Sequence, residues 1–131
     1  MSELFLVGYP PEDLVLKPAF QAACRAKIEE LARETANGGP AMLIGTPWAE
    51  DGRLYNAYCL LDQGTIAAVR RKVDLPNYGV FDEKRVFVPG PMPGPVSFTH
   101  VPVGFVTPNQ MRGADGSWTS RTPFACEGLF G

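Results

Sequence analysis

The fold is decided by the stretch LYNAYCLLDQGTIAAVRRKV, residues 54–73. Two runs of aromatic, branched and apolar residues, 54–61 and 65–73, flank Asp62-Gln63-Gly64. Runs of this composition are typical of strands, and a three-residue connection with glycine in the left-handed region joins antiparallel neighbours. The sequence therefore predicts a β-hairpin in the middle of the chain.

The residues before this hairpin predict a helix and another strand. AMLIGTPW, residues 41–48, is a short apolar run typical of a buried strand. From Lys17 to about Thr35 the apolar positions recur with helical spacing, and the glycines of Asn37-Gly38-Gly39 would end that helix. One stripe of the helix is expected to face the core, namely Phe20, Cys24, Ile28 and Leu31.

The ends of the chain complete the expected architecture. ELFLVGY, residues 3–9, predicts a buried strand, and VSFTHVPVGFV, residues 96–106, predicts a strand or hairpin that Pro102 confines partly to an edge. Strand, helix, strand and hairpin together give an α/β or layered α+β fold. We expect a folded unit over residues 1–106 and an irregular tail over 107–131, where neither a strand nor a helix period is found.

Composition narrows the class of protein. The 12 basic and 14 acidic residues give a net charge of −2, which argues against nucleic-acid binding. Cys24, Cys59 and Cys126 are odd in number and widely spaced, which favours free thiols in a reducing compartment over disulfides or a metal site. No apolar run reaches the roughly 20 residues of a membrane span, and the N-terminus lacks a basic leader. These features predict a cytoplasmic protein without metal, membrane or nucleic-acid partners.

Several residues could carry chemistry, each with a simpler structural alternative. A partly desolvated Glu3 could act as a general base or be a solvated terminal charge. Lys72 could stabilise an oxyanion or be a solvated lysine at a strand end. Asp82 and Glu83 could pair with Lys72 or with Arg85. His100, the one histidine, is interpreted as a surface residue of a strand, and a single histidine excludes a two-histidine metal site.

Two long motifs, ELFLVGYPPEDL and KVDLPNYGVFDEKRVFVPG, with LYNAYCLLDQGTI between them, resemble a known family. They are similar to the nitrilase-type glutaminase domain of glutamine-dependent NAD⁺ synthetases, a branch of the carbon–nitrogen hydrolases. The resemblance runs from about residue 2 to about residue 98. It implies an αββα sandwich, incomplete here because the family's first strand and helix have no counterpart before residue 3.

The resemblance also implies a function and a set of site residues. Glu3 stands at the position of the general base and Lys72 at that of the lysine that stabilises the tetrahedral intermediate, in a Glu-Lys-Cys triad. Tyr78 and Glu83 match positions that line the glutamine pocket. Ammonia released from glutamine would serve the ATP-dependent amidation of deamido-NAD⁺ on a separate synthetase domain. No cofactor is expected in this chain, since ATP and deamido-NAD⁺ would bind that domain, and the intact enzyme is expected to be a homo-oligomer.

The family's nucleophile has no obvious counterpart. Alignment through Phe98 places Pro108 where the cysteine of a Cys-Glu-Asp motif belongs, and Cys126-Glu127 repeats part of that motif further along. Cys126 can serve if residues 107–121 form an inserted loop. Three functions stay open: a glutamine amidohydrolase, another carbon–nitrogen hydrolase such as an amidase or nitrilase, and a non-catalytic remnant that pairs through its exposed sheet.

Overall fold

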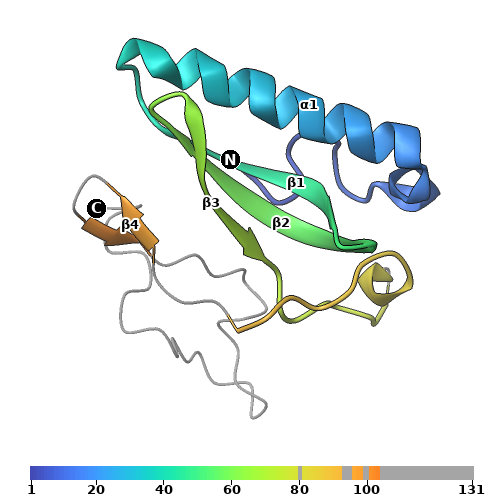
Figure 1. Ribbon diagram of the computed structural model, residues 1–131. Coiled ribbons are helices and arrows are strands. Elements are labelled where there is room, and N and C mark those ends of the chain that lie inside the picture. Colours follow the sequence, from blue (N-terminus) through green and yellow to red (C-terminus); the bar gives the residue numbers. More distant parts are fainter. Residues whose placement is uncertain (80, 93–95, 99–100, 104–131) are drawn as a thin grey trace.

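The computed structural model describes residues 1–79, 81–92, 96–98 and 101–103. One long helix, α1 (Pro18–Glu34), lies across a three-stranded antiparallel sheet of β1 (Met42–Glu50), β2 (Arg53–Asp62) and β3 (Thr65–Arg71), in the order β1-β2-β3 (Figure 1). Three short 3₁₀ segments and a small hairpin complete the described elements: η1 (Glu12–Leu16), η2 (Thr35–Asn37), η3 (Glu83–Arg85), β4 (Val96–Phe98) and β5 (Val101–Val103). The expected mixed fold of helix and antiparallel sheet is confirmed.

The central hairpin forms where the sequence predicted it, with a tighter turn. Asp62 pairs with Thr65, so the connection has two residues and not three. Gln63 and Gly64 both have positive φ, 49° and 83°, which matches the right-handed twist of the flanking strands. The left-handed conformation predicted for Gly64 is confirmed. A similar two-residue connection, Asp51-Gly52, joins β1 to β2.

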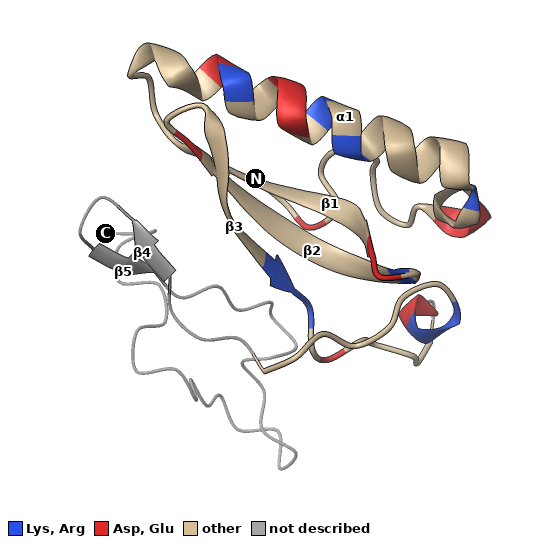
Figure 2. Ribbon diagram, in the orientation of Figure 1, with Lys and Arg blue, Asp and Glu red and all other residues tan. Residues whose placement is uncertain are grey.

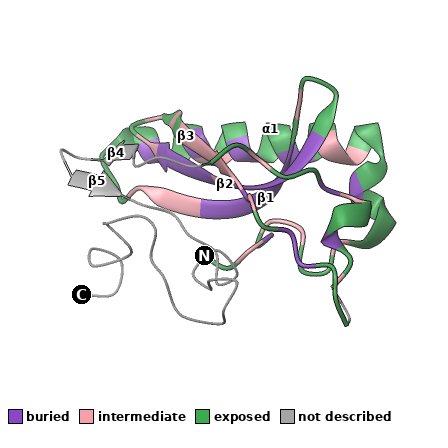
Figure 3. Ribbon diagram, turned by 90° about the horizontal axis from the view of Figure 1, so that it is seen from below, coloured by how far each residue is buried: buried purple, intermediate pink, exposed green. Residues whose placement is uncertain are grey.

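Helix α1 also lies where expected and ends in the predicted way. Its buried residues are Cys24, Ile28 and Ala32, and Gly38 ends the helical segment in the left-handed region with φ 76°. The exposed surface of α1 carries ion pairs between Arg25 and Glu29 and between Lys27 and Glu30. Figure 2 shows this row of charges along α1, whose exposed surface is also visible in Figure 3.

The predicted strand over residues 3–9 is wrong. These residues form turns, in which the N–H groups of Val7 and Gly8 both donate to the carbonyl of Leu4, and Leu4 itself has φ 49°. Leu4 is fully buried whereas Phe5 is 53% exposed, so the apolar run does not signal a strand buried on both faces. A short apolar run lacks the length that separates a strand from a buried turn.

Alternation along β2 divides the core into two clusters. Tyr55, Ala57, Cys59 and Leu61 face α1 and pack with Ile28 and Trp48. The intervening residues face the other side, where Leu54 packs with Leu4, Val15, Leu75 and Phe87. Figure 3 shows the buried residues concentrated on β1 and β2. The second cluster attaches both the N-terminal turn and the segment after β3 to the face of the sheet opposite α1.

Gly45 allows the N-terminal turn to lie directly on β1. The Leu6 N–H donates to the Gly45 carbonyl at 3.0 Å, and a Cβ at Gly45 would lie 2.6 Å from the Leu4 nitrogen and 2.6 Å from the Ser2 carbonyl oxygen. Any larger residue would push away the turn that carries Glu3.

We expect Gly45→Ala to lower the free energy of unfolding by roughly 1–3 kcal/mol, the usual cost of overpacking a core. Chemical denaturation measures this change. Ala49→Ser adds one atom at an exposed position of the same strand and should change stability by about 0.5 kcal/mol or less. Equal stability of the Gly45→Ala variant and the wild type would contradict the close approach.

Candidate active site

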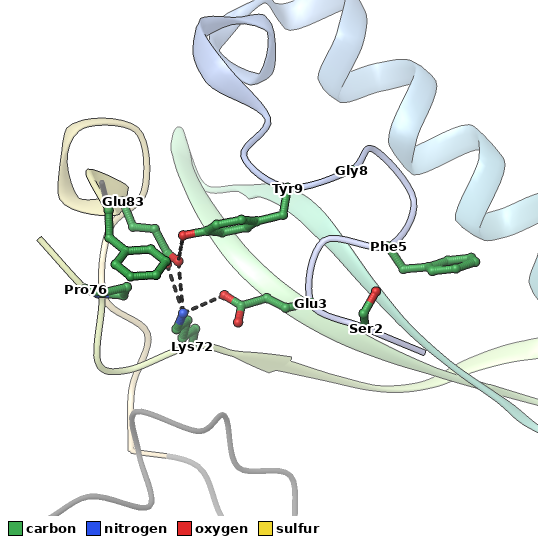
Figure 4. A pocket seen from close by; sticks show the side chains of 9 residues that line it. Ser2, Glu3, Phe5, Gly8, Tyr9, Lys72, Pro76 and Glu83 are labelled. Carbon is green, nitrogen blue, oxygen red and sulfur yellow. Dashed lines mark hydrogen bonds and ion pairs between the residues drawn. The ribbon is translucent and has the colours of Figure 1, made fainter. Parts of the chain in front are cut away.

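A cavity of about 610 Å³ opens between the N-terminal turn and the segment that follows β3. Figure 4 shows side chains from both segments directed toward one another across it. The residues that line the cavity are Ser2, Glu3, Phe5, Gly8, Tyr9, Lys72, Pro76, Phe81 and Glu83. Three of the four site residues predicted from the sequence are therefore brought together.

Lys72 lies at the centre of the polar part of this cavity. It comes directly after β3, where its N–H donates to the Asn56 carbonyl at 2.7 Å and its own carbonyl accepts from the Gly90 N–H at 2.8 Å. Its side chain is 3% exposed, and its ammonium donates to Glu3 Oε1 at 2.5 Å and to the two Glu83 oxygens at 3.0 and 3.1 Å. The interpretation of Lys72 as a solvated lysine is thereby excluded.

Glu83 is a fully partnered buried carboxylate. Its side chain is 5% exposed, and besides Lys72 it accepts hydrogen bonds from the Tyr9 hydroxyl at 3.0 Å and from Asn56 Nδ2 at 3.3 Å. Its backbone N–H donates to the Pro76 carbonyl, which closes the loop between these residues. A buried charge tolerates such burial when it is paired and hydrogen-bonded.

Glu3 is the more accessible of the two carboxylates. Its side chain is 24% exposed, and Oε1 accepts from Lys72 Nζ at 2.5 Å and from Asn56 Nδ2 at 2.6 Å. The carboxylate thus lies in a polar cluster at the cavity wall, within reach of a molecule inside the cavity (Figure 4). Such a group can exchange protons with a bound molecule.

The remaining charges of the segment after β3 separate from this cluster. Arg85 pairs with Asp82 at 2.7 Å and with Asp13, and all three side chains are largely exposed. Of the two pairings considered for the acidic residues, Glu83 takes Lys72 and Asp82 takes Arg85. The segment therefore directs one carboxylate into the cavity and the other into solvent.

Tyr78 lies outside the residues that line the cavity. It is 65% exposed, and its ring meets that of Phe81 edge-on, with the centroids 5.6 Å apart. Phe81 in turn lies 6.2 Å from the ring of Tyr9. Tyr78 is thus connected to the cavity wall through Phe81.

Two site residues were missed by the sequence analysis, Tyr9 and Asn56. Tyr9 falls at the end of the strand predicted over residues 3–9, and that prediction gives its side chain no role in the site. Asn56 is 1% exposed and lies in β2 within the run 54–61, whose other residues are apolar or aromatic. A polar residue at a predicted core position requires hydrogen-bond partners, and this signal could have identified Asn56.

The two described cysteines lie away from the cavity. Cys24 is buried on the core-facing side of α1, and Cys59 is buried in β2, which agrees with the predicted helix stripe and strand. Burial raises the pKa of both thiols, and that of Cys59 to about 12, which makes them poor nucleophiles. Pro108, Cys126, His100 and the domain boundary at residue 106 lie outside the described residues.

Over the described part of the chain, no cluster of three His, Cys, Asp or Glu side chains is arranged to hold a metal ion. Over the same residues, no helix has both the length and the apolar character needed to cross a membrane.

Residues 1–114 match the carbon–nitrogen hydrolase family, and the chain belongs to that family. It is 47% identical over 88 residues to the glutamine-dependent NAD(+) synthetase of Thermotoga maritima, which covers 67% of this chain and 15% of that protein. It is 40% identical over 104 residues to the protein of the same name from Rhodobacter capsulatus, covering 79% of this chain and 19% of that one.

A solved structure agrees with these sequence relatives. The glutamine-dependent NAD+ synthetase from Acinetobacter baumannii, in complex with adenosine diphosphate, matches with a TM-score of 0.65 and 32% identity, over 79% of this chain and 19% of that one. The resemblance stated from the motifs and the expected nitrilase-like fold are confirmed. The chain spans less than one fifth of the length of these relatives.

Removal of the Lys72 ammonium should leave two carboxylates without their shared cation. We expect Lys72→Met to lower the free energy of unfolding by about 3–5 kcal/mol at neutral pH, as measured by urea denaturation. Lys27→Met removes a lysine from an exposed ion pair on α1. It should leave the midpoint of urea denaturation close to that of the wild type. Similar losses in both variants would contradict the buried cluster.

The Tyr9 phenol should titrate abnormally. Partial burial, its hydrogen bond to Glu83 and the nearby charges of Glu83 and Glu3 raise its pKa above the ordinary value of 10.0. The folded protein therefore holds this proton more tightly than the unfolded chain. The resulting stability is present below about pH 10 and is lost as the pH rises above it.

We therefore expect Tyr9→Phe to lose less stability than the wild type on going from about pH 9 to pH 11, measured by denaturation at each pH. Ultraviolet titration of the phenols should show one late component fewer in this variant. Tyr78→Phe, which removes an exposed phenol, serves as the control. An alkaline loss of the same size in Tyr9→Phe and in the wild type would rule out the Tyr9–Glu83 hydrogen bond.

Proposed function

We propose that this chain carries the base and the oxyanion-stabilising cation of a glutamine amidohydrolase, and that it releases ammonia from glutamine. The observation that carries the proposal is the convergence of Glu3, Lys72 and Glu83 on one cavity, with Lys72 bonded to both carboxylates. Membership in the carbon–nitrogen hydrolase family and similarity to glutamine-dependent NAD⁺ synthetases support it.

The chemistry is an acyl transfer through a thioester. In this proposal residues 107–121 form an inserted loop and Cys126 is the nucleophile, whose thiol attacks the side-chain amide carbon of glutamine while Glu3 accepts the thiol proton. The carbonyl oxygen becomes an oxyanion, which an N–H of Lys72 stabilises. Glu3 then protonates the amine as the carbon–nitrogen bond breaks, and ammonia leaves. Glu3 then takes a proton from water, and the resulting hydroxide attacks the thioester carbon. The carbon–sulfur bond breaks to give glutamate and a thiolate, to which Glu3 returns the proton.

The cavity suits a small zwitterionic substrate. Its volume of about 610 Å³ is that of a small-molecule site, and its wall combines charged groups with apolar ones such as Phe5 and Phe81. In this proposal Glu83 holds Lys72 in place at the base of the cavity. Tyr78, next to Phe81 and exposed at the rim, would contact the substrate when it is bound.

We extend the proposal to the cellular context that the family resemblance implies. Ammonia would be consumed on a synthetase domain that binds ATP and deamido-NAD⁺, and the chain itself would need no cofactor. The corresponding cellular site is the cytoplasm, and the assembly of the intact enzyme would be a homo-oligomer.

A non-catalytic remnant is the second candidate function. It is favoured by one observation, that the described residues lining the cavity include no cysteine, while the two described cysteines are buried elsewhere. This candidate keeps the cluster of Glu3 and Lys72 but not the nucleophile. An amidase or nitrilase of the same family differs from the first proposal in substrate alone.

Intact-protein mass spectrometry after exposure to a glutamine-like electrophile tests the proposal. We expect rapid single labelling at Cys126 in the folded sample but not in the unfolded one, together with ammonia release from glutamine. Cys126→Ser should abolish both, whereas Cys24→Ser, at a buried thiol outside the cavity, should abolish neither. Labelling should also slow in Glu3→Gln, because the base that accepts the thiol proton is lost.

The alternatives give different results in the same experiment. Equal and slow labelling of all three cysteines, with no ammonia released, would establish the remnant. Rapid labelling of Cys126 with turnover of simple amides or nitriles, but not of glutamine, would assign another carbon–nitrogen hydrolase.

A further inference from the structure

We propose that Asn56 is a positioning residue of this site, whose buried side-chain amide sets the Glu3 carboxylate against the Lys72 ammonium. The proposal rests on the glutaminase function for its catalytic meaning. The contact on which it depends can be tested without any activity.

The geometry of Asn56 is that of a bridge between two acids. Its Nδ2 lies 2.6 Å from Glu3 Oε1 and 3.3 Å from Glu83 Oε2, and the residue is 1% exposed. Both neighbours are carboxylate oxygens, which accept hydrogen bonds, so the amide must present its N–H₂ to them and not its oxygen. Asn56 therefore joins the two carboxylates without adding charge.

The backbone of Asn56 belongs to the sheet, whereas that of Glu3 does not. Asn56 lies in β2, the central strand, where it pairs with Pro47 of β1 and its carbonyl accepts from the Lys72 N–H at 2.7 Å. Glu3 lies outside the strands, in a turn that is tied to β1 on both sides, by the Met1 ammonium on the Leu43 carbonyl and by the Leu6 N–H on the Gly45 carbonyl. The orientation of the Glu3 side chain therefore depends on its own contacts, and a rigid donor is the better support for a reactive group.

The proposed mechanism makes this support necessary. All three N–H groups of the Lys72 ammonium are accounted for by its contacts with Glu3 Oε1 and the two oxygens of Glu83. To stabilise an oxyanion, Lys72 must redirect one of these donors. Asn56 holds Glu3 and Glu83, and Tyr9 holds Glu83, while that exchange occurs.

The decisive variant is Asn56→Asp, which keeps the shape of the side chain and replaces a donor by an acceptor. The introduced carboxyl faces Glu3 and Glu83, with Lys72 and the Tyr9 hydroxyl as the nearby donors of the cluster. Repulsion from the two acids makes the folded state hold a proton on this carboxyl more tightly than the unfolded chain. The stability of the variant should therefore fall as the pH rises.

We expect the unfolding equilibrium constant of Asn56→Asp to exceed that of the wild type at least about tenfold at pH 8, with a smaller excess at pH 5. Adding Glu3→Gln to Asn56→Asp exchanges the donor and the acceptor. The amide introduced at position 3 can donate a hydrogen bond to the carboxylate introduced at position 56. At pH 8 the unfolding equilibrium constant of the double variant should be about tenfold lower than that of Asn56→Asp alone. Asn56→Asp with Glu29→Gln, on the exposed surface of α1, makes the same change in net charge and should give no rescue.

Kinetics test the positioning role itself. In Asn56→Asp we expect kcat for glutamine to fall about tenfold or more while KM changes less than about threefold, because the base is displaced and the substrate still binds. Asn37→Asp makes the same chemical change at the end of the helical segment, where the side-chain oxygen accepts from the Gly39 N–H. It should leave both constants unchanged.

The outcomes separate this inference from the proposed function. Without glutaminase activity in the wild type, the proposed function fails, and the rescue by Glu3→Gln decides the Asn56 contact by itself. The contact between Asn56 and Glu3 is overturned if the double variant is no more stable than Asn56→Asp, or if both variants are unfolded. Rescue of stability with equal kcat in Asn56→Asp and the wild type overturns the positioning role, and leaves Asn56 as a purely structural residue.

Discussion

The burial of the Lys72 ammonium between two carboxylates is the interaction on which the rest of the structure depends. A lysine side chain that is 3% exposed is stable only when its charge is paired and its hydrogen bonds are made. The partners come from segments far apart in sequence, since Glu3 precedes Lys72 by 69 residues and Glu83 follows it by 11. The ion pairs thus fasten the N-terminal turn and the segment after β3 to the same end of the sheet.

The sheet brings the three charged residues together in two ways: side chains of β2 alternate between its faces, and two glycines let neighbouring backbone approach closely. Along β2, one set of residues builds the core under α1, and the other set supplies Leu54 and Asn56 to the opposite face. Two glycines let backbone lie directly on the strands. Gly45 accepts the N-terminal turn, and Gly90 lies so close to Arg71 that a Cβ there would be 2.4 Å from the Arg71 Cβ. Packing on the face opposite α1 therefore fixes the site.

Regular elements were predictable from the sequence because each obeys a local period. Helix α1, strand β1 and the hairpin β2–β3 follow from apolar spacing and turn residues. The N-terminal turn was not predictable, because the positive φ of Leu4 depends on tertiary packing and leaves the apolar pattern unchanged. For the site, the motifs predicted Glu3, Lys72, Tyr78 and Glu83, of which all but Tyr78 line one cavity. The pairing of Glu83 with Lys72 was considered from the sequence, but the contacts with Tyr9 and Asn56 were not. Tyr9 became recognisable only through its distance to Glu83, 74 residues away. Asn56 is a polar residue at a predicted core position, but its carboxylate partners became known only from the structure.

The two carboxylates differ in a way that suits the different roles proposed for them. Glu83 accepts from Lys72, Tyr9 and Asn56 across both of its oxygens and is 5% exposed, so neither oxygen is left open to a ligand. Glu3 receives its two hydrogen bonds on a single oxygen and stays 24% exposed at the cavity wall. A carboxylate that holds Lys72 in place benefits from having both oxygens hydrogen-bonded, whereas a general base needs an oxygen that a substrate can reach. The same ammonium therefore pairs with one carboxylate whose oxygens are both occupied and with another that keeps an oxygen accessible from the cavity, as the proposed mechanism requires.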